Sequence, residues 1–252
     1  MSIDWSPLRA ELARHRADGL SLPFWWRDDD ATAPTPALHR LLKLSAELDL
    51  PVHIAVIPKT ASPDLAEIAG ATPLMVPIVH GWAHENRAPE GAKRAEFGHP
   101  DADAAAKTEA ALRHMRQLFG RDMLAMFVPP WNRIDPSVTS GLAAQGYRAL
   151  STFTPRKARR CAGLVQINTH IDPIAWRAGG GLMPPEAIIA KTIMLLQDRR
   201  SGRADCTEPL GFLSHHLVQD AAIWDFARGF LSELLDGGAE ARHLLRQPLD
   251  LP

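Results

Sequence analysis

The sequence has few cysteines, no long apolar run and no excess of charge. Only Cys161 and Cys206 are cysteines, and because they lack metal-ligand spacing and make no convincing disulfide framework, we expect reduced thiols. No uninterrupted apolar stretch approaches the roughly 20 residues of a membrane-spanning helix. The 28 basic residues nearly balance 29 acidic ones, which argues against nucleic acid or an anionic membrane surface as a partner. A small molecule or a saccharide is favoured, whereas no feature indicates an oligomeric state.

The N-terminal segment lacks the apolar core of a signal peptide. Charged residues are scattered through the first 20 positions, whereas a secretory signal needs a continuous apolar region. This pattern, with the missing membrane span, favours the cytoplasm. No internal repeat divides the chain, and 252 residues of which 46% are apolar suit one large α/β barrel. We therefore predict a single domain over residues 1–252.

Short apolar runs alternate with longer amphipathic ones, which is typical of βα units around a parallel sheet or barrel. We predict seven strands, at Pro23–Arg27, Val52–Ile57, Leu74–His80, Leu124–Val128, Tyr147–Thr152, Leu164–Asn168 and Leu210–Ser214. We predict helices at Pro7–Ala17, Pro36–Leu48, Pro63–Ile68, Asp101–Phe119, Pro136–Gln145, Pro185–Arg199 and Ala221–Leu235. The segment Gly81–Pro100 is expected to be a long binding loop or lid, and Arg156–Gly163 a solvated basic turn.

Polar residues gather at the C-terminal ends of the predicted strands, where barrels carry their catalytic groups. Such clusters follow six of the seven strands: Arg27-Asp28-Asp29-Asp30, His80, Pro129-Pro130-Trp131-Asn132, Ser151-Thr152, Asn168-Thr169-His170 and Ser214-His215-His216. Six clusters on one rim are hard to explain by surface placement alone. The pattern therefore indicates a site at this end of the barrel.

The aspartate run and a pair of histidines suit a metal. The carboxylates emerge from a buried strand, where like charges need a cation or a shared proton, although a single aspartate there can also cap a helix or make a turn. His80 and His84 are four residues apart, and in a helical turn that spacing puts both imidazoles on one side. Two histidines and one carboxylate make a three-ligand site with room for water, which is catalytic in character.

His215 and His216 end the last predicted strand. A histidine whose pKa lies near neutrality can protonate a leaving group. We expect at least one of the two to be a core histidine whose ring is satisfied by the backbone. The other is a candidate general acid.

The residues resemble the polysaccharide deacetylase superfamily of carbohydrate esterases, within a branch with Arg-x-Asp-Asp and His-Gly-Trp-x-His motifs. The resemblance covers most of the chain in order: Arg27-Asp28-Asp29-Asp30-Ala31, His80-Gly81-Trp82-Ala83-His84-Glu85-Asn86, Lys93-Arg94-Ala95-Glu96-Phe97-Gly98, Val128-Pro129-Pro130-Trp131-Asn132-Arg133 and Gly211-Phe212-Leu213-Ser214-His215-His216. It implies an α/β fold, an irregular (β/α)7 TIM-like barrel.

The resemblance also implies roles. It makes Asp29 the general base and Asp30 a metal ligand beside His80 and His84, with the register Asp28 as base and Asp29 as ligand left open. His215, or else His216, is then the general acid. The implied reaction is metal-dependent removal of an acyl group, such as acetyl, from an amide of an amino sugar or related small molecule. The metal is expected to be Zn²⁺, with Co²⁺, Mn²⁺ and Ni²⁺ as alternatives.

Further residues are expected to line the pocket. Trp82 and Trp131 are candidates to stack on a sugar ring, although tryptophans near strand ends are as often packing residues. Backbone N–H groups of the Pro130-Trp131-Asn132 turn are candidates for an oxyanion site. Asn86 and Asn132 complete the expected substrate-binding set.

The sequence departs from the family pattern in two places. Val128 stands where an arginine usually braces the catalytic base, which leaves Arg27 and Arg133 as candidates for that role, and Ala31 replaces a common glycine. Two other readings follow. Some members of the superfamily open cyclic amides or imides without a metal, and a decayed site would leave a non-catalytic barrel that binds a carbohydrate or nucleotide-sugar.

Overall fold

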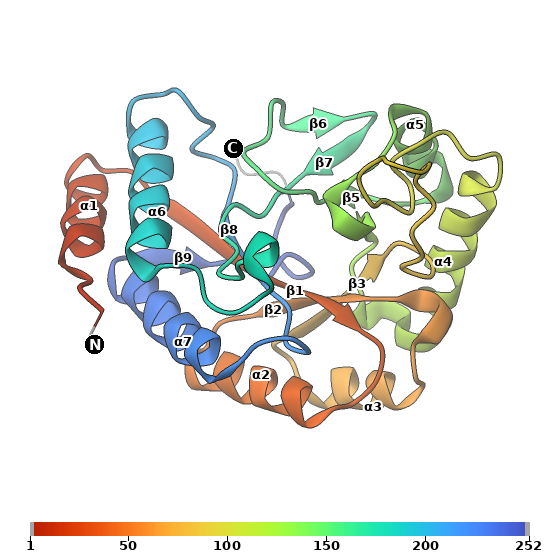
Figure 1. The fold of residues 1–252 in the computed structure, drawn as a ribbon, viewed down its shortest axis with the longest axis horizontal. Helices are drawn as coiled ribbons and strands as arrows, with labels where there is room; N and C mark the ends of the chain where they lie inside the picture. The colour runs from red at the N-terminus through yellow and green to blue at the C-terminus, as the bar shows by residue number, and fades with distance from the viewer. Residues whose placement is uncertain (1–2, 250–252) are drawn as a thin grey trace.

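Mostly parallel strands form a curled sheet at the centre of the computed structural model, which describes residues 3–249 (Figure 1). The sheet order is β6-β7-β5-β4-β3-β2-β1-β8, with β9 paired to β1, and only β6 runs antiparallel to its neighbour. The strands are β1 (Leu22–Ala31), β2 (Val52–Val56), β3 (Met75–His80), β4 (Met126–Val128), β5 (Ala149–Leu150), β6 (Arg160–Cys161), β7 (Leu164–Gln166), β8 (Leu210–Ser214) and β9 (Ala239–Ala241).

Helices cover the outer face of the sheet (Figure 1). They are α1 (Ser6–Ala17), α2 (Pro36–Glu47), α3 (Asp64–Ala71), α4 (Ala104–Phe119), α5 (Pro136–Gln145), α6 (Pro185–Arg200) and α7 (Ala221–Asp236), with short 3-10 turns η1 (Pro58–Thr60), η2 (Gly120–Asp122), η3 (Pro130–Asn132) and η4 (Trp176–Ala178). Side chains cap three of the helices, because Thr35, Asp135 and Asp220 each accept a hydrogen bond from a backbone N–H of the first turn of α2, α5 and α7.

The central strands are buried on both faces. Every residue of β2 and β3 is buried, which matches their continuous apolar sequences and the covering of parallel sheets on both sides. The segment that follows β7 closes the curl, since Thr169 bridges to Phe153 beyond β5 and Ile171 bridges to Phe212 of β8. The predicted α/β barrel class is therefore confirmed, and the carboxyl ends of the strands share one rim.

Three local predictions were wrong. β1 does not end at Arg27 but continues through the aspartates to Ala31. β6 and β9 were not predicted, because each is only two or three residues long and pairs through backbone atoms, which leaves little periodicity. Residues Arg156–Gly163 are not simply a solvated turn, because Arg156 is buried and the segment contains β6.

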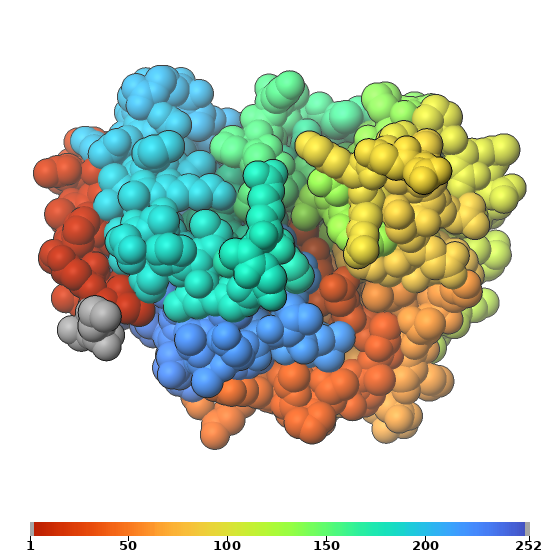
Figure 2. Space-filling view, viewed as in Figure 1, coloured from red at the N-terminus to blue at the C-terminus, as the bar shows by residue number. Residues whose placement is uncertain are grey.

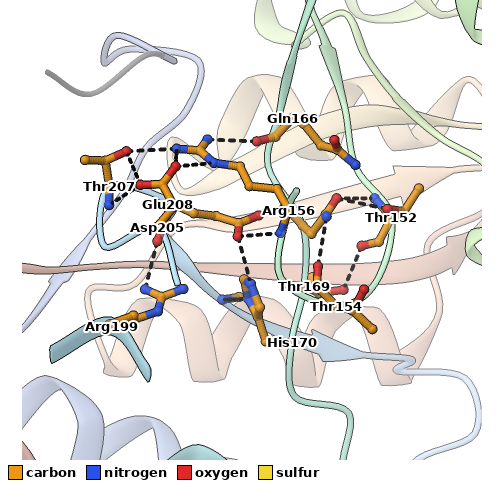
Figure 3. A network of polar contacts seen from close by, with 12 residues as sticks. Thr152, Thr154, Arg156, Gln166, Thr169, His170, Arg199, Asp205, Thr207 and Glu208 are labelled. Atoms are coloured by element: carbon orange, nitrogen blue, oxygen red, sulfur yellow. Dashed lines mark hydrogen bonds and ion pairs between the residues drawn. The ribbon is translucent and has the colours of Figure 1, made fainter. Parts of the chain in front are cut away.

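A buried polar network behind the rim holds this segment in place (Figure 3). The Glu208 carboxylate accepts hydrogen bonds from the backbone N–H groups of Arg156 and Asn168 and lies 3.2 Å from His170 Nε2. Arg199 donates to the Glu208 carbonyl, and the Arg156 guanidinium pairs with Asp205 at 2.6 Å. Since buried charges are stable only when paired and hydrogen-bonded, this network fixes the strand ends that it joins.

Among residues 3–249, no helix is both long and apolar enough to cross a membrane. The finding agrees with the absence of long apolar runs in the sequence.

His53 on β2 gives the fold a predicted sensitivity to acid. Its Nδ1 donates to the Trp26 carbonyl and its Nε2 accepts the Leu244 N–H, so the folded protein holds the neutral ring. Burial lowers the pKa of His53 to about 3 from 6.5. Between pH 3 and pH 6.5, His53 is therefore neutral in the folded protein and takes up a proton on unfolding. The contribution of neutral His53 to the free energy of unfolding is complete above pH 6.5. It is lost as the pH falls towards 3, by up to about 1.4 kcal/mol per pH unit.

We expect His53→Gln to flatten this dependence, because a glutamine amide supplies one donor and one acceptor but does not titrate. Urea unfolding measured from pH 7 to pH 4 checks the prediction. His39→Gln, on the exposed surface of α2, is the matched control. Equal pH slopes in wild type and His53→Gln would show that His53 does not control this range.

Candidate metal centre and its surroundings

Three side chains at the rim converge as a metal centre requires. One ligand atom each from Asp30, His80 and His84 lies within 4.8 Å of the others. Asp30 Oδ1 is 3.0 Å from His80 Nε2 and 3.3 Å from His84 Nε2. His80 Nδ1 lies 3.0 Å from the Val128 carbonyl oxygen, so Nδ1 carries the proton and Nε2 faces the centre. The structure thus brings the three predicted ligands together.

The aspartate is presented by a bulge in β1. Asp28 opposes Ile54 of β2, whereas Ala31 opposes Val56, so β1 contains an extra residue between these pairs. Asp30 adopts a φ of 76°, a left-handed conformation that is uncommon outside glycine. Neighbouring strand residues normally point to opposite faces. The bulge is the turn by which Asp29 and Asp30 both approach His80, whose pKa their charges raise although burial lowers it.

The electrostatics of Asp30 favour its charged form. Burial by itself raises the pKa of Asp30, but the hydrogen bond and charge of His80, together with the His215 and His84 imidazoles, hold it well below the usual range. Asp30 is therefore an anion in a partly buried setting, which is the state in which a carboxylate binds a metal ion.

A loop, and not a helical turn, positions His84. Residues 81–84 form a bend in which Gly81 and His84 have φ values of 57° and 55°. The buried Glu96 carboxylate accepts the backbone N–H groups of Trp82, Ala83 and His84 at 2.8–3.2 Å. A Cβ at Gly81 would lie only 2.4 Å from Glu96 Oε2, so glycine is required there. The expected long loop thus contributes the carboxylate that shapes its own first turn.

Arg27 braces Asp29. The fully buried guanidinium lies 2.9 Å from Asp29 Oδ1 through Nε and donates to Oδ2 through Nη2 at 3.0 Å. Its remaining N–H groups donate to Ser151 Oγ, the Thr152 carbonyl and Asn132 Oδ1. One hydrogen bond and one close ion contact thus hold the Asp29 carboxylate against the guanidinium. Where the family pattern has an arginine to brace the catalytic base, this chain has Val128. Arg27, which lies two residues before Asp29 on β1, contacts Asp29 instead.

Removing the guanidinium leaves Asp29 buried without a counter-charge. We expect Arg27→Met to lower the free energy of unfolding by about 3–5 kcal/mol, the range found when one partner of a buried ion pair is removed. Urea unfolding measures the loss. In the Arg27→Met background, Asp29→Asn should restore part of the stability, since the two changes share one interaction. Additive losses would mean that the pair is not coupled.

Asp28 has different partners. Its fully buried carboxylate accepts hydrogen bonds from Ser214 Oγ at 2.6 Å and from the His216 backbone N–H at 3.0 Å, and it pairs with His216 Nδ1. Burial is the largest single influence on the pKa of His216 and lowers it, but the charge and hydrogen bond of Asp28, with the charge of Asp30, together raise it. Asp28 therefore joins β1 to the turn after β8, and the structure places His216, not His215, in the core.

His215, on that turn, is only partly buried and lies near enough to Asp30 for its imidazole to help lower the pKa of that carboxyl. Its ring lies edge-on to Trp176 at 4.8 Å, and Trp176 donates its indole N–H to Asp172 Oδ2 at 2.8 Å. His215 is near enough to Asp172 to lower its pKa, although burial has the larger effect and raises it. The sequence analysis missed Asp172 and Trp176. Their spacing of four residues after a strand was the available signal.

The η3 turn connects the two halves of the site. Trp131 and Asn132 both have a φ of 57°, and such left-handed pairs concentrate at functional sites. The Trp131 ring packs against His84 with centroids 4.3 Å apart, while Asn132 accepts from Arg27. The buried Pro130 lies beside Gly81. The η3 turn thus contacts both His84, a candidate metal ligand, and Arg27, the arginine that pairs with Asp29.

The other predicted residues have structural contacts. Trp82 is partly buried and packs against the main core, and Asn86 is exposed, with its carbonyl accepting the N–H groups of Ala88 and Ala95. Arg133 donates to the Arg94 carbonyl and does not touch Asp29. Figure 2 shows a hollow on this face, bordered by the teal segment around η4, the green segments and the yellow loop, with red β1 visible within it.

No protein-family model and no curated protein matches the sequence. Solved structures do resemble the fold. A Mycobacterium smegmatis protein assigned as a polysaccharide deacetylase has a TM-score of 0.62 at 18% identity, covering 86% of this chain and 84% of its own. A family 4 carbohydrate esterase from Streptomyces lividans, solved with acetate, has a TM-score of 0.52 at 14% identity, with 87% and 91% covered.

The same fold also occurs without activity. A Bacillus anthracis protein described as a pseudoenzyme of carbohydrate esterase family 4 has a TM-score of 0.56 at 12% identity, with 87% of this chain and 63% of that chain covered. At such identities the likeness shows the fold, which is that of the polysaccharide deacetylases, and the chemistry of this chain has to be argued from its own side chains.

Proposed function

We propose that this protein is a metal-dependent hydrolase that removes an acyl group, in the first instance acetyl, from an amide of an amino sugar or related small molecule. The observation that carries the proposal is the convergence of Asp30, His80 and His84, with the braced carboxylate of Asp29 and the His215 imidazole beside them. Ligands, base and acid then stand together at the rim of a deacetylase fold.

The donor set fits a divalent transition ion. Two imidazole nitrogens and one carboxylate oxygen are the ligands of many catalytic zinc sites, and the second ring nitrogen of His80 is held by a backbone carbonyl, as ligating histidines usually are. Co²⁺, Mn²⁺ and Ni²⁺ suit the same donors. An ion held there would polarise the amide carbonyl and acidify a water molecule.

The protein groups supply the proton transfers. Asp29, paired with the Arg27 guanidinium, would accept a proton from the attacking water, and His215, beside Trp176, would donate one to the departing amine. The alternative, with Asp28 as base and Asp29 as ligand, is less favourable, because the Asp28 carboxylate already accepts hydrogen bonds from Ser214 and His216. We therefore assign Asp29 as base and Asp30 as ligand. Trp131, against His84, and Trp176, against His215, are the aromatic surfaces available to a substrate ring.

Two observations bear on the competing functions. A metal-free ring-opening enzyme has no need of two histidines and a carboxylate within 4.8 Å. A non-catalytic carbohydrate-binding barrel is favoured by the likeness to a pseudoenzyme and by Val128, yet Arg27 contacts Asp29 as an active site needs. The expected cytoplasmic location stays a prediction.

The test combines metal content with turnover. Protein purified without chelator is analysed for bound metal, then stripped and reloaded with Zn²⁺, Co²⁺, Mn²⁺ or Ni²⁺, and acetate release from N-acetylglucosamine and a panel of other N-acetyl amino sugars is followed. We expect about one ion per chain and metal-dependent acetate release. A protein that binds no ion and gains no activity on reloading contradicts the proposal, and sugar binding with metal but without turnover favours the binding role.

A further inference from the structure

A pocket adjoins the site at Asn132 and Thr152, two residues that accept hydrogen bonds from Arg27. It has a volume of about 580 Å³ and lies between the η3 turn, the start of α5, the end of β5 and the β6–β7 hairpin. Its lining includes Asn132, Arg133, Thr152, Cys161 and Gln166. This volume falls within the range of small-molecule sites and far exceeds what an acetyl group fills.

The pocket shares its wall with the catalytic side chains. Asn132 Oδ1 accepts from Arg27 Nη2 at 2.7 Å, the Thr152 carbonyl accepts from Nη1 at 3.3 Å, and Arg27 pairs with Asp29. Asn132 and Thr152 thus line the pocket and also hold the guanidinium that contacts Asp29, so a molecule bound in the pocket lies one side chain away from Asp29.

The pocket floor is held rigidly from behind. Arg156 donates to the Gln166 carbonyl at 2.9 Å, as Figure 3 shows. Asn168 accepts both the N–H and the hydroxyl of Thr152 at 2.9 and 3.0 Å. Because the Glu208 network fixes Arg156 and Asn168 in turn, the lining groups are preorganised and little side-chain order is lost on binding.

The polar groups that line the pocket include one cationic side chain, Arg133, and two side-chain amides, Asn132 and Gln166. The oxygen of Asn132 is already used, which leaves its NH₂ group, and Arg133 uses only Nη1, for the Arg94 carbonyl. Gln166 adds a further amide. No aspartate or glutamate is among the lining residues, and the nearest acid along the chain, Asp135, accepts from Ser137 at the start of α5. The pocket therefore offers one positive charge and amide donors without a balancing anion.

We propose that this pocket binds a carboxylate carried by the substrate and that Arg133 recognises it. The inference rests on the proposed function and narrows its substrate class to N-acyl compounds that bear an acid group apart from the amide. A guanidinium pairs with a carboxylate through two parallel hydrogen bonds. One arginine balances one negative charge, which fits a carboxylate better than a doubly charged phosphate.

The first test compares two substrates that differ by one charge. N-acetylmuramic acid and its methyl ester share ring and amide, but only the acid carries a carboxylate. We expect kcat/KM to favour the acid, and Arg133→Met to reduce that preference about 10- to 100-fold, the worth of a charged hydrogen bond. Arg133→Lys should keep part of it, and Arg121→Met, at an exposed site, should change nothing. An unchanged preference in Arg133→Met overturns the proposal.

The second test needs no turnover. Cys161 lines the pocket and is partly buried, whereas the other cysteine, Cys206, is exposed. In a Cys206→Ser background, the rate at which a methanethiosulfonate reagent modifies Cys161 is measured with N-acetylmuramic acid or its methyl ester present. We expect protection by the acid and much less by the ester. Equal protection, or none by either, overturns the carboxylate pocket.

The two tests separate the hypotheses. Protection of Cys161 by the acid without any acetate release supports the pocket and contradicts the proposed hydrolase function. Hydrolysis of both compounds at equal kcat/KM, with no selective protection, supports the hydrolase and contradicts the pocket.

Discussion

Replacing His80 and His84 together by alanine is expected to abolish metal retention and to reduce acetate release to the rate without protein. Both imidazoles contribute a ligand atom, so the remaining Asp30 carboxylate is left as a single weak ligand. Far-ultraviolet circular dichroism should change little, because the strands and helices do not depend on these rings. Elemental analysis after gel filtration measures the metal.

The matched control is the double variant His39→Ala with His114→Ala, which removes two histidines from α2 and α4, away from the rim. It should keep the metal content and activity of wild type. If the His80→Ala, His84→Ala protein retains one ion per chain, the centre lies elsewhere in the molecule and the proposed chemistry has no basis at this rim.

Asp29→Asn is expected to lower kcat by about 10²- to 10⁴-fold, the contribution typical of a general base. The amide keeps the size of the side chain and can still accept from Arg27, but it takes up no proton. Metal content should stay at the wild-type level, since Asp29 is not among the three converging ligands. Steady-state kinetics at saturating metal measures kcat, and elemental analysis of the same preparation measures the metal content.

Asp28→Asn distinguishes the two aspartate registers. Its carboxylate serves Ser214 and His216, so we expect this variant to lose stability more than kcat. The alternative register requires the reverse: Asp28→Asn would remove the base, and Asp29→Asn would remove metal. Observing that reversed pattern would reassign both residues.

The sequence predicted those features that depend on local pattern. The buried strands, the helix starts at proline and the motif residues at the rim all follow from periodicity and neighbouring residues. The pairing of Arg27 with Asp29 also had a signal, because residues two apart in a strand share a face. The alternation of side chains along the strand did not by itself show whether Arg27 or Arg133 contacts Asp29. In the structure Arg133 donates to the Arg94 carbonyl instead.

The remaining features depend on contacts between distant parts of the chain. Glu96 reaches back to the loop at His84, and Glu208 joins Asn168 to Arg156, although no pattern near either glutamate indicates its partners. The bulge at Asp30 arises from its register with β2 and is not encoded in the aspartate run itself. The four-residue spacing of His80 and His84 is compatible with a helical turn, but the chain forms a loop there. The Glu96 carboxylate holds that loop so that both imidazoles still lie close together.

The Asp28 carboxylate has a consequence for how His215 moves. The carboxylate accepts the Ser214 hydroxyl and the His216 backbone N–H, and Ser214 also pairs with Asp28 in the β1–β8 ladder, so the chain is attached to β1 on both sides of His215. Only the two side-chain torsions of His215 are left to vary. The range of positions open to the imidazole is therefore small, and under the proposed function the scissile nitrogen of a substrate would have to lie within that range. We therefore expect the distance from β1 to His215, which the Asp28 hydrogen bonds fix, to limit which substrates can be hydrolysed.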